Sequence, residues 1–514
     1  MTLPDHLPVL VVLLPALTAV ALLFIGDGGA ELHGGHGQRQ LQWSRRVSLA
    51  SVALFALLAA LLVARVADGT LLVYRVGEWP APFGIALVVD RLGAMMVALT
   101  AAVALPVLLY ASGGWDGHGR HFHPMFQFQL MGLAGAFVTG DLFNLFVFFE
   151  VLLIASYVLM LHGQGRERFK AGLHYVVLNL AASALFLVGV ALLYAMTGTL
   201  NLADLALRVP QLRGSEAALA QAGGLVLLVV FGFKAAMAPL AVWLPATYAA
   251  TSAPVAALFA IMTKVGVYAL LRVHGLALAT SVVGVMGALA ARTLPRLVAW
   301  LTVASVGTVL VGIGLFDTAA WSAALYYLLN STLVVAGMFL LGEIVAAQRG
   351  DAADHLVPGP AVGQPVLLGL AMLLAAASAA GLPPLPGFIG KLMLLEASAA
   401  HPWVGAVWAV VLGAGLLTLV GLARAGSILF WHVREDLPAC TMSGASLRLQ
   451  GATGLLLAMT VAVSVFAGPV QQYTAAAAAQ LADRAGYGRA VLGPGADSVR
   501  PYRFDPPAAA ETTR

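Results

Sequence analysis

Apolar segments long enough to cross a lipid bilayer recur along the whole 514-residue chain. A membrane-spanning helix needs about 20 apolar residues, and fourteen segments approach or exceed that length. Because 61% of the residues are hydrophobic and only 10% are charged, an ordinary soluble domain is excluded. We therefore predict an all-α polytopic membrane protein with about 14 transmembrane helices. The segments cover approximately residues 7–25, 47–67, 91–111, 125–140, 142–161, 171–196, 221–243, 252–272, 275–292, 297–317, 320–345, 365–396, 402–431 and 450–470.

The first segment and the cysteine content narrow the class of membrane protein. The N-terminal sequence MTLPDHLPVLVVLLPALTAVALLFI carries Asp5 where a signal peptide has basic residues, so we expect it to be retained as the first span. The single cysteine, Cys440, excludes an internal disulfide and any iron–sulfur cluster held by this chain alone. The sequence has no phosphate-binding glycine motif, CxxC pair or nucleophile elbow. We therefore expect no cofactor and no soluble catalytic domain.

Basic residues in the connections predict how the spans are oriented. The net charge is +4, but the arginines are scattered over short loops and a tail, so we expect no nucleic-acid partner. Cytoplasmic connections are richer in lysine and arginine than external ones, and here the connections after odd-numbered spans hold thirteen against six. This bias predicts an external N-terminus. The odd set is Arg39, Arg45, Arg46, Arg120, Arg166, Arg168, Lys170, Arg292, Arg296, Arg349, Arg424, Arg434 and Arg448, and the even set is Arg65, Arg75, Arg91, Arg208, Arg213 and Arg272.

Two of the spans are interrupted by helix-breaking residues. Pro239 follows Lys234 by five residues, and the sequence GLPPLPGFIGK ends at Lys391. Proline breaks a helix, and inside a membrane the freed carbonyl groups need a protein or water partner. Paired broken helices in the two halves of a chain are typical of inverted-repeat transporters with an ion path near the midplane.

Lysine is rare in this chain and lies where a charge is costly. The sequence has only four lysines, Lys170, Lys234, Lys264 and Lys391, and the last three lie in apolar segments. A charge at the bilayer centre costs about 2.5 to 3.5 kcal/mol, so it needs a partner or water. Arginine does not lose its proton in proteins, whereas a buried lysine can. We interpret these three lysines as proton carriers. The alternative, that each reaches an interface or joins two helices, stays open.

One glutamate also lies inside an apolar segment. Glu150 stands in LFNLFVFFEVLLIASYVLM, nine residues after Asp141, so it is expected near the middle of the membrane. Such a carboxylate needs a cationic partner, and we predict Lys234 for that role. A purely structural ion pair is the alternative. Asp141 begins the same span, where it either caps the helix or admits protons.

Several further polar residues are weaker candidates. His174 and Asn179 are expected on roughly one helical face, where they either hydrate a path or join two helices. Tyr268 lies one turn beyond Lys264 and is expected to share its water. Glu343 and Glu396 lie near span ends, where exposure at the interface is the simplest interpretation.

Two loops are rich in histidine and resemble metal sites at first sight. Their glycine and arginine neighbours favour ordinary loop histidines, so we predict no metal. The residues are His33 and His36 in one loop and His118, His121 and His123 in the other.

Three longer motifs resemble a known family. FGFKAAMAPLAVWLPATYAATSAPVAALFAIMTKVGVYALLR strongly resembles the core motif of the antiporter-like membrane subunits found in respiratory complex I, membrane-bound hydrogenases and Mrp/Pha cation/proton antiporters. RTLPRLVAWLTVASVGTVLVGIG and LPPLPGFIGKLMLLEA resemble further family segments, so the likeness covers about residues 125–430. Within the family, GDLFNLFVFFEVLLIASYVLM is most similar to the D-type subunits of Mrp/Pha antiporters.

The resemblance implies a fold and a function. The fold has two inverted five-helix repeats, and Glu150, Lys234, Lys264 and Lys391 match the family's proton path through two half-channels. The implied function is antiport of protons against Na⁺ or K⁺ in the bacterial inner membrane, together with other membrane subunits. A proton-pumping subunit of complex I or of a hydrogenase is the alternative.

The sequence departs from the family pattern at two places. Ala241 stands where the family often has histidine, and Asn330 with Ser331 stands where it often has histidine or lysine. Asparagine and serine hold water but carry no charge at neutral pH, so we expect a water-dependent central relay.

The chain is expected to divide into four parts. They are N-terminal helices in residues 1–124, the antiporter-like core in 125–430, a last transmembrane helix in 431–470 and a flexible C-terminal tail in 471–514.

Overall fold

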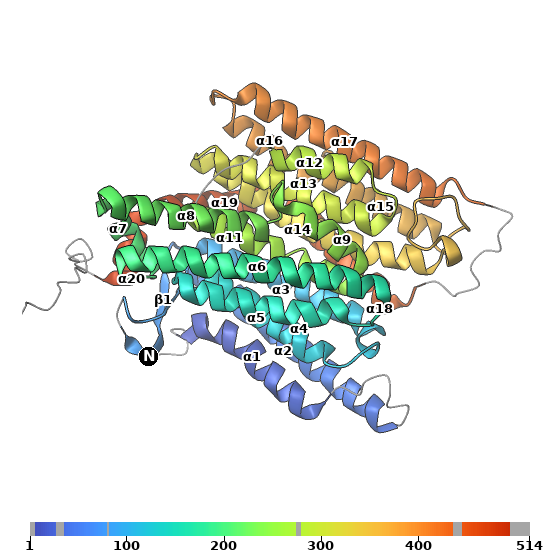
Figure 1. Cartoon of the computed structure of the whole chain (residues 1–514). Helices are drawn as coiled ribbons and strands as arrows, with labels where there is room; N and C mark the ends of the chain where they lie inside the picture. The colour runs from blue at the N-terminus through green and yellow to red at the C-terminus, as the bar shows by residue number, and fades with distance from the viewer. Residues whose placement is uncertain (1–5, 27–34, 80–81, 274–278, 435–444, 494–514) are drawn as a thin grey trace, which may run out of the picture.

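A computed structural model describes residues 6–26, 35–79, 82–273, 279–434 and 445–493. Long helices run side by side through the molecule, as Figure 1 shows. Among the described residues, eleven helices are long and apolar enough to cross a membrane. The prediction of a helical, multi-pass membrane protein is therefore confirmed. The helices are α1 (Leu7–Ile25), α2 (Gly35–Val66), α3 (Arg91–Ala111), α5 (Leu142–Leu161), α6 (Arg166–Thr197), α8 (Gly214–Lys234), the pair α10 (Ala253–Phe259) and α11 (Met262–Val273), α13 (Leu294–Gly314), α14 (Thr318–Ala347), α17 (Val404–Phe430) and α18 (Leu447–Val465).

The remaining three apolar segments are shorter or broken helices. They are α4 (Phe122–Val138), α12 (Ala279–Leu289) and the pair α15 (Pro365–Ala380) and α16 (Pro386–Ala397). The helices α10, α11, α13 and α14 are buried over most of their length, whereas fewer than half of the residues are buried in α1, α2, α17 and α18. Figure 1 shows α17 along one long edge of the molecule and α1 with α2 along the other. The most deeply buried helices therefore form the centre, and the outer ones present apolar side chains that suit lipid.

The predicted helix breaks are confirmed. Helix α8 ends at Lys234, and Ala236 then adopts a left-handed conformation with φ of 58° before the chain continues into the short helices η5 (Leu240–Val242) and α9 (Trp243–Ala250). Helix α15 ends at Ala380, Gly381 has φ of 87°, and α16 begins at Pro386. A third break, not predicted, separates α10 from α11.

Each end of the helical bundle contains one aspartate next to an end of α3. Asp90 caps the start of α3 next to an antiparallel hairpin, β1 (Leu72–Arg75) and β2 (Ala86–Val89), in which Leu72 pairs with Val89. Asp116 lies in the turn η3 (Trp115–Gly117) just beyond the other end of α3. We call these the Asp90 end and the Asp116 end.

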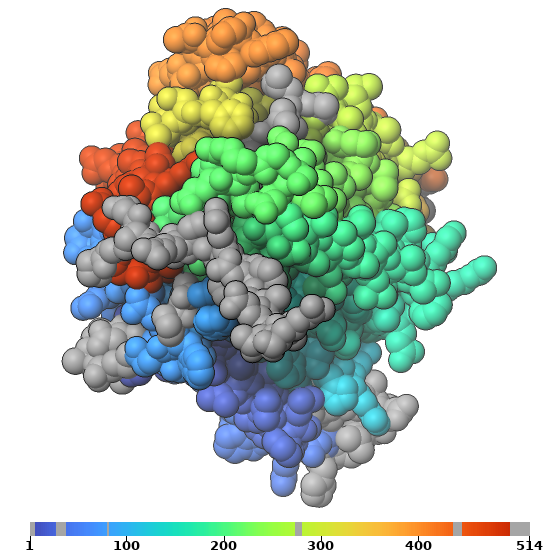
Figure 2. Space-filling model, turned by 60° about the vertical axis from the view of Figure 1, so that its left-hand side comes forward, coloured from blue at the N-terminus to red at the C-terminus, as the bar shows by residue number. Residues whose placement is uncertain are grey.

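The segment after α18 is folded. Helices α19 (Ala467–Ala482) and α20 (Arg484–Leu492) pack at the Asp90 end, where Thr474 contacts Ser322 at 3.0 Å and α20 packs against α7 (Leu202–Arg208). Figure 2 brings this end forward and shows the segment in red beside the blue N-terminal and yellow central residues. The prediction of a flexible tail from residue 471 is therefore wrong for 471–492, because its alanine run favours a helix whose small side chains pack closely. Residues 494–514 lie outside the described part.

Candidate functional site

Lys234 and Glu150 belong to one hydrogen-bonded network. The Lys234 Nζ donates to Asn179 Oδ1 at 3.1 Å and to Ser183 Oγ at 3.5 Å, and Ser183 donates to the Glu150 carboxylate. The ammonium also lies 5.8 Å from the ring centroid of Phe149. The predicted partnership is therefore present in a modified form, since the Ser183 hydroxyl bridges the two charged groups in place of a direct ion pair.

Helix α6 supplies the neutral groups of this network. Asn179 and Ser183 are four residues apart on one helical face, and Asn179 is fixed by donating to the Tyr175 carbonyl at 2.9 Å. Sequence reasoning missed Ser183, although its spacing from Asn179 in an apolar helix was the available signal. The expectation that His174 shares this face is wrong, because five residues rotate a helix by about 140° and the His174 side chain is exposed.

Side chains from other segments form hydrogen bonds with the backbone groups that the break after α8 leaves unpaired. The Trp243 indole donates to the Phe233 carbonyl at 3.0 Å and stacks on Tyr175 with 5.4 Å between ring centroids. The Thr280 hydroxyl accepts from the Ala238 N–H at 3.2 Å. Lys234, the last residue of α8, therefore stands at a fixed helix terminus, whose carbonyl dipoles favour a positive charge.

Lys264 is the central buried lysine. It lies on α11, is 1% exposed, and its Nζ has no hydrogen-bond partner among the described residues. Helix α11 approaches the end of α8 closely at Gly266, where a Cβ would stand 2.4 Å from the Ala235 nitrogen. The buried hydroxyls of Thr263 and Ser281 also lack a described partner. A buried ammonium without a protein acceptor requires water, so Lys264 is itself a candidate for hydration.

Lys391 lies at the second predicted helix break. Its Nζ donates at 2.7 Å to the carbonyl of Ala380, the last residue of α15, and lies 6.0 Å from the Tyr327 ring centroid. A cavity of about 20 Å³ adjoins it, which is room for one water molecule. The cavity is lined by Val285, Leu301, Ala304, Thr308, Tyr327, Asn330, Ser331, Val334, Val335, Ala379, Lys391, Ala414 and Thr418.

Asn330 shares the Lys391 cavity. Its Oδ1 accepts from the Ser378 hydroxyl at 2.7 Å, while its Nδ2 is buried without a described hydrogen-bond partner. The Asn330 amide is therefore fixed through its oxygen, and its Nδ2 is left to donate to a water molecule in the cavity. This arrangement is compatible with the expected water-dependent relay between Lys264 and Lys391.

Two other predicted residues take structural positions. Asp141 caps α5, because its Oδ1 accepts from the Asn144 N–H at 2.8 Å, so the capping interpretation is confirmed. The Tyr268 hydroxyl donates to the Phe137 carbonyl at 2.9 Å and accepts from Arg272 at 3.2 Å. The Tyr268 hydroxyl is thus bound to Arg272 and, among the described residues, makes no direct hydrogen bond to Lys264.

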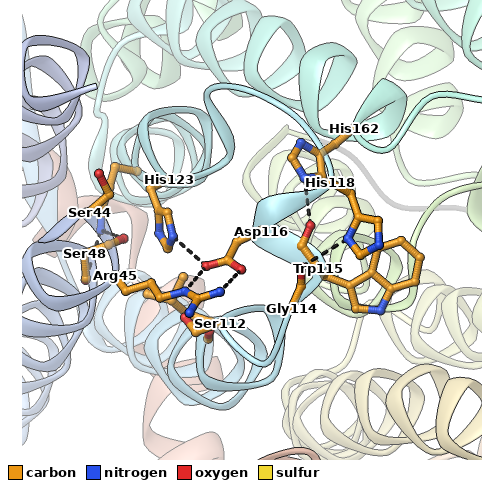
Figure 3. Close-up of polar contacts among 12 residues, drawn as sticks. Ser44, Arg45, Ser48, Ser112, Gly114, Trp115, Asp116, His118, His123 and His162 are labelled. Carbon is orange, nitrogen blue, oxygen red and sulfur yellow. Dashed lines mark hydrogen bonds and ion pairs between the residues drawn. The ribbon is translucent and has the colours of Figure 1, made fainter. Parts of the chain in front are cut away.

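The loop histidines join separate contacts at the Asp116 end, shown in Figure 3. His118 Nδ1 contacts the Gly114 carbonyl at 3.1 Å, and His123 Nε2 contacts Asp116 at 3.0 Å. Within the described residues, no three His, Cys, Asp or Glu side chains converge as a metal site. His33 and the His36 side chain lie outside the described residues.

Asp116 joins α2 to the α3–α4 turn. Arg45 donates to both of its carboxylate oxygens at 2.6 Å, and the Asp116 side chain is fully buried (Figure 3). Burial alone would raise the pKa of Asp116, but the hydrogen bonds and charges of Arg45 and His123 outweigh it and lower the pKa. The ionised carboxylate is therefore stabilised by the fold.

Asp116→Asn is expected to lower the stability of the purified protein by about 1 to 3 kcal/mol, because Arg45 loses its charged acceptor. Since the pKa of Asp116 is lowered by folding, the stabilisation is present above the ordinary carboxyl pKa of about 4 and is lost only as the pH falls through the folded value. Thermal unfolding at about pH 8, well above the carboxyl range, should therefore show the full difference from wild type. The exposed Asp351→Asn is the control, and equal stability of both variants would contradict this assignment.

Comparison with known families places the chain among membrane transport proteins. The sequence profile of the family described as "NADH:quinone oxidoreductase/Mrp antiporter, TM" matches residues 139–418. The D-type subunit of a probable K(+)/H(+) antiporter from Rhizobium meliloti (strain 1021) is 38% identical over 531 residues, covering 93% of this chain and 96% of that protein. The D-type subunit of a Na(+)/H(+) antiporter from Bacillus subtilis (strain 168) is 35% identical over 453 residues, covering 84% and 89%.

A solved structure shares the fold. A chain of the Mrp complex from Dietzia sp. DQ12-45-1b superposes with a TM-score of 0.82 and 27% identity. The likeness covers 96% of this chain and 100% of that one.

Proposed function

The chain belongs to the NADH:quinone oxidoreductase/Mrp antiporter transmembrane family, and we propose that it is a proton-translocating subunit of a multisubunit Na⁺(K⁺)/H⁺ antiporter. It is then a transporter subunit and not an enzyme. The curated relatives are named as D-type antiporter subunits, which supports this assignment. Its partners are the other membrane subunits of such a complex, its substrates are protons with Na⁺ or K⁺, and its location is a bacterial inner membrane.

The single observation that carries the proposal is the alignment of buried titratable groups with helix breaks. Lys234 ends α8, Lys264 follows the α10–α11 break, and Lys391 contacts the end of α15. Broken helices supply carbonyl groups that accept from an ammonium without permanently neutralising it. Lys234 and Lys391 therefore have acceptors that can hold and release a proton, and Lys264 depends on water for that role.

The first half of the path joins Glu150 to Lys234. The Ser183 hydroxyl contacts both groups, so it can donate to the carboxylate while accepting from the ammonium. When Glu150 takes up a proton, Lys234 loses the nearby negative charge and releases its own proton more readily. The hydroxyl bridge therefore couples the protonation of the two residues.

The second half of the path runs from Lys264 to Lys391. No charged residue replaces the family's usual histidine or lysine at Asn330, so water beside Asn330 and Ser331 completes the connection. The Asn330 amide orients that water, and Lys391 receives the proton beside the Ala380 carbonyl. Asp141 remains a candidate entry group in addition to its capping role.

The fourteen apolar segments form fourteen membrane crossings in this proposal, with two inverted five-helix repeats inside an antiporter-like core of residues 125–430. Residues 1–124 add three helices before the core, and 431–470 contain the last crossing. The positive-inside bias places the Asp116 end in the cytoplasm and the N-terminus outside.

Ser183→Ala is expected to slow antiport by about ten-fold or more, because a hydrogen bond between charged partners is worth about 1.5 to 3 kcal/mol. Because Glu150 and Lys234 are unchanged in this variant, the loss of antiport rate measures the contribution of the Ser183 hydroxyl alone. Ser156→Ala is the matched control, because among the described residues that hydroxyl contacts the Leu153 carbonyl and the Tyr175 hydroxyl and no charged group. Initial rates of cation-driven proton movement measure the effect, and equal rates for both variants would contradict the bridge.

The function itself is tested in membrane vesicles that contain the whole complex. Adding Na⁺ or K⁺ should move protons when this subunit is present, and its deletion should abolish the movement. The alternative is a pump subunit of complex I or a hydrogenase. Purified complexes that oxidise NADH or hydrogen, and that show no cation-driven proton movement, would support that alternative.

A further inference from the structure

A buried ion pair lies at the Asp90 end of α11, the helix that carries Lys264. Arg272, near the end of α11, contacts Asp90 with 2.7 Å between Nη2 and Oδ2, and the two side chains are 10% and 3% exposed. The other Asp90 oxygen accepts from the Gly93 N–H at 2.7 Å, as the cap of α3. The carboxylate is therefore fixed by two separate contacts and holds the guanidinium in place.

Two tyrosines enclose the guanidinium. Its central carbon lies 5.1 Å from the ring centroid of Tyr268 and 5.7 Å from that of Tyr487, which belongs to α20. Tyr268 is itself fixed, because its hydroxyl donates to the Phe137 carbonyl. Aromatic faces attract a cation and exclude water from it. Segments from both ends of the chain thus cover Arg272.

The covered cation lies in line with the central lysine. Lys264, Tyr268 and Arg272 follow one another at intervals of four residues, so they share one face of α11. Eight residues of helix separate the first and the last by about 12 Å. From Lys264 toward the Asp90 end, this face therefore carries first a tyrosine ring and then a permanent positive charge.

We propose that Arg272 is an electrostatic seal that prevents protons and Na⁺ or K⁺ from passing directly between Lys264 and the compartment at the Asp90 end. A guanidinium keeps its charge at every physiological pH and repels other cations, as fixed arginines do in selective pores. Asp90 offsets the cost of burying it. The proposal rests on the proposed function, because only a Lys264 that carries protons needs such a barrier.

The seal explains why an arginine, and not a second lysine, follows Lys264 on this face of α11. The sequence alone places Arg272 among the basic residues of an external connection. The structure buries it, and its acidic partner comes from a distant part of the chain. A lysine at this position would be able to release a proton, whereas a barrier must not.

The test is passive proton leak in proteoliposomes that contain the complete purified complex. Internal pH is followed with a trapped dye after an external pH jump, without Na⁺ or K⁺ and with permeant thiocyanate to balance charge. The double variant Asp90→Asn/Arg272→Gln removes both charges and keeps a polar side chain at each position. It should raise the leak, and Arg272→Gln alone should raise it about ten-fold, the factor expected for the loss of a unit charge acting over about 12 Å at an effective dielectric constant of about 20.

Three variants separate the cation from its packing. Arg272→Lys keeps a positive charge that can dissociate, so it should leak less than Arg272→Gln, whereas the exposed Arg213→Gln at the same end should stay at the wild-type level. Arg272→Gln alone should leak at least as much as the double variant, and it carries the test if the double variant does not assemble. An unchanged leak in assembled variants that lack the Arg272 charge overturns the seal. Because this assay contains no transported cation, its result does not depend on whether Lys234 and Lys391 support antiport.

Discussion

Lys391→Ala is expected to reduce cation-driven proton movement to below about one hundredth of the wild-type rate, the scale of losing a group that transfers protons. Lys391 is buried, lies beside a cavity that holds about one water, and is the only lysine that follows Lys264 in the sequence. Apart from Lys391, the only titratable side chain among the described residues that line the cavity is Tyr327, so no other lysine, histidine or carboxylate there can take over proton transfer. The rate is measured in vesicles with the complete complex.

A structural role for Lys391 is separated from proton transfer by a second substitution. Lys391→Gln keeps a donor that reaches toward the Ala380 carbonyl but carries no exchangeable charge. It should be as inactive as Lys391→Ala while assembling normally. Lys170→Ala, at an exposed position near the start of α6, is the control for general loss of lysine. Near-normal antiport in an assembled Lys391→Gln complex would show that the residue only holds the end of α15.

The spans and the buried lysines are predictable because both follow from composition. An apolar segment of spanning length has few alternatives to a membrane helix, and a lysine inside it is conspicuous in a chain that uses arginine elsewhere. Helix breaks at Pro239 and before Lys391 are predictable for the same local reason. In the part of the chain that it describes, the structure confirms the helical architecture with eleven candidate spans, the burial of the three lysines and both helix breaks.

Contacts between distant segments are not predictable from local pattern. Ser183 is an ordinary residue in a transmembrane helix until Glu150 and Lys234 are placed on either side of it. Arg272 near a span end suggests exposure at the interface, because nothing near it in the sequence indicates Asp90 as its partner. Both roles depend on how helices pack against one another.

Two errors have simpler causes. The expectation for His174 counts residues along the helix without converting them to rotation, and five positions turn the side chain more than a quarter turn away from the Asn179 face. The expectation of a flexible C-terminal segment rests on its alanine run and on its glycine and proline residues. Alanine favours helix formation, and Ala477 and Ala478 are small enough to pack tightly.

Lys234→Arg separates proton release from positive charge more directly than removal of the side chain. Arginine keeps a cation close to Ser183 and Glu150, so the electrostatic part of the network is preserved. It does not release its proton, so transfer through this position stops. If Lys234 were only a counter-charge for Glu150, arginine would replace it without loss.

The deciding measurement is the initial rate of Na⁺- or K⁺-driven proton movement in proteoliposomes that contain the complete complex with Lys234→Arg. Subunit composition is checked on the same preparation, so that failed assembly is not mistaken for lost transfer. We expect a rate below about one hundredth of wild type with all subunits present. A rate close to wild type in the assembled complex would contradict the claim that the buried lysines carry protons.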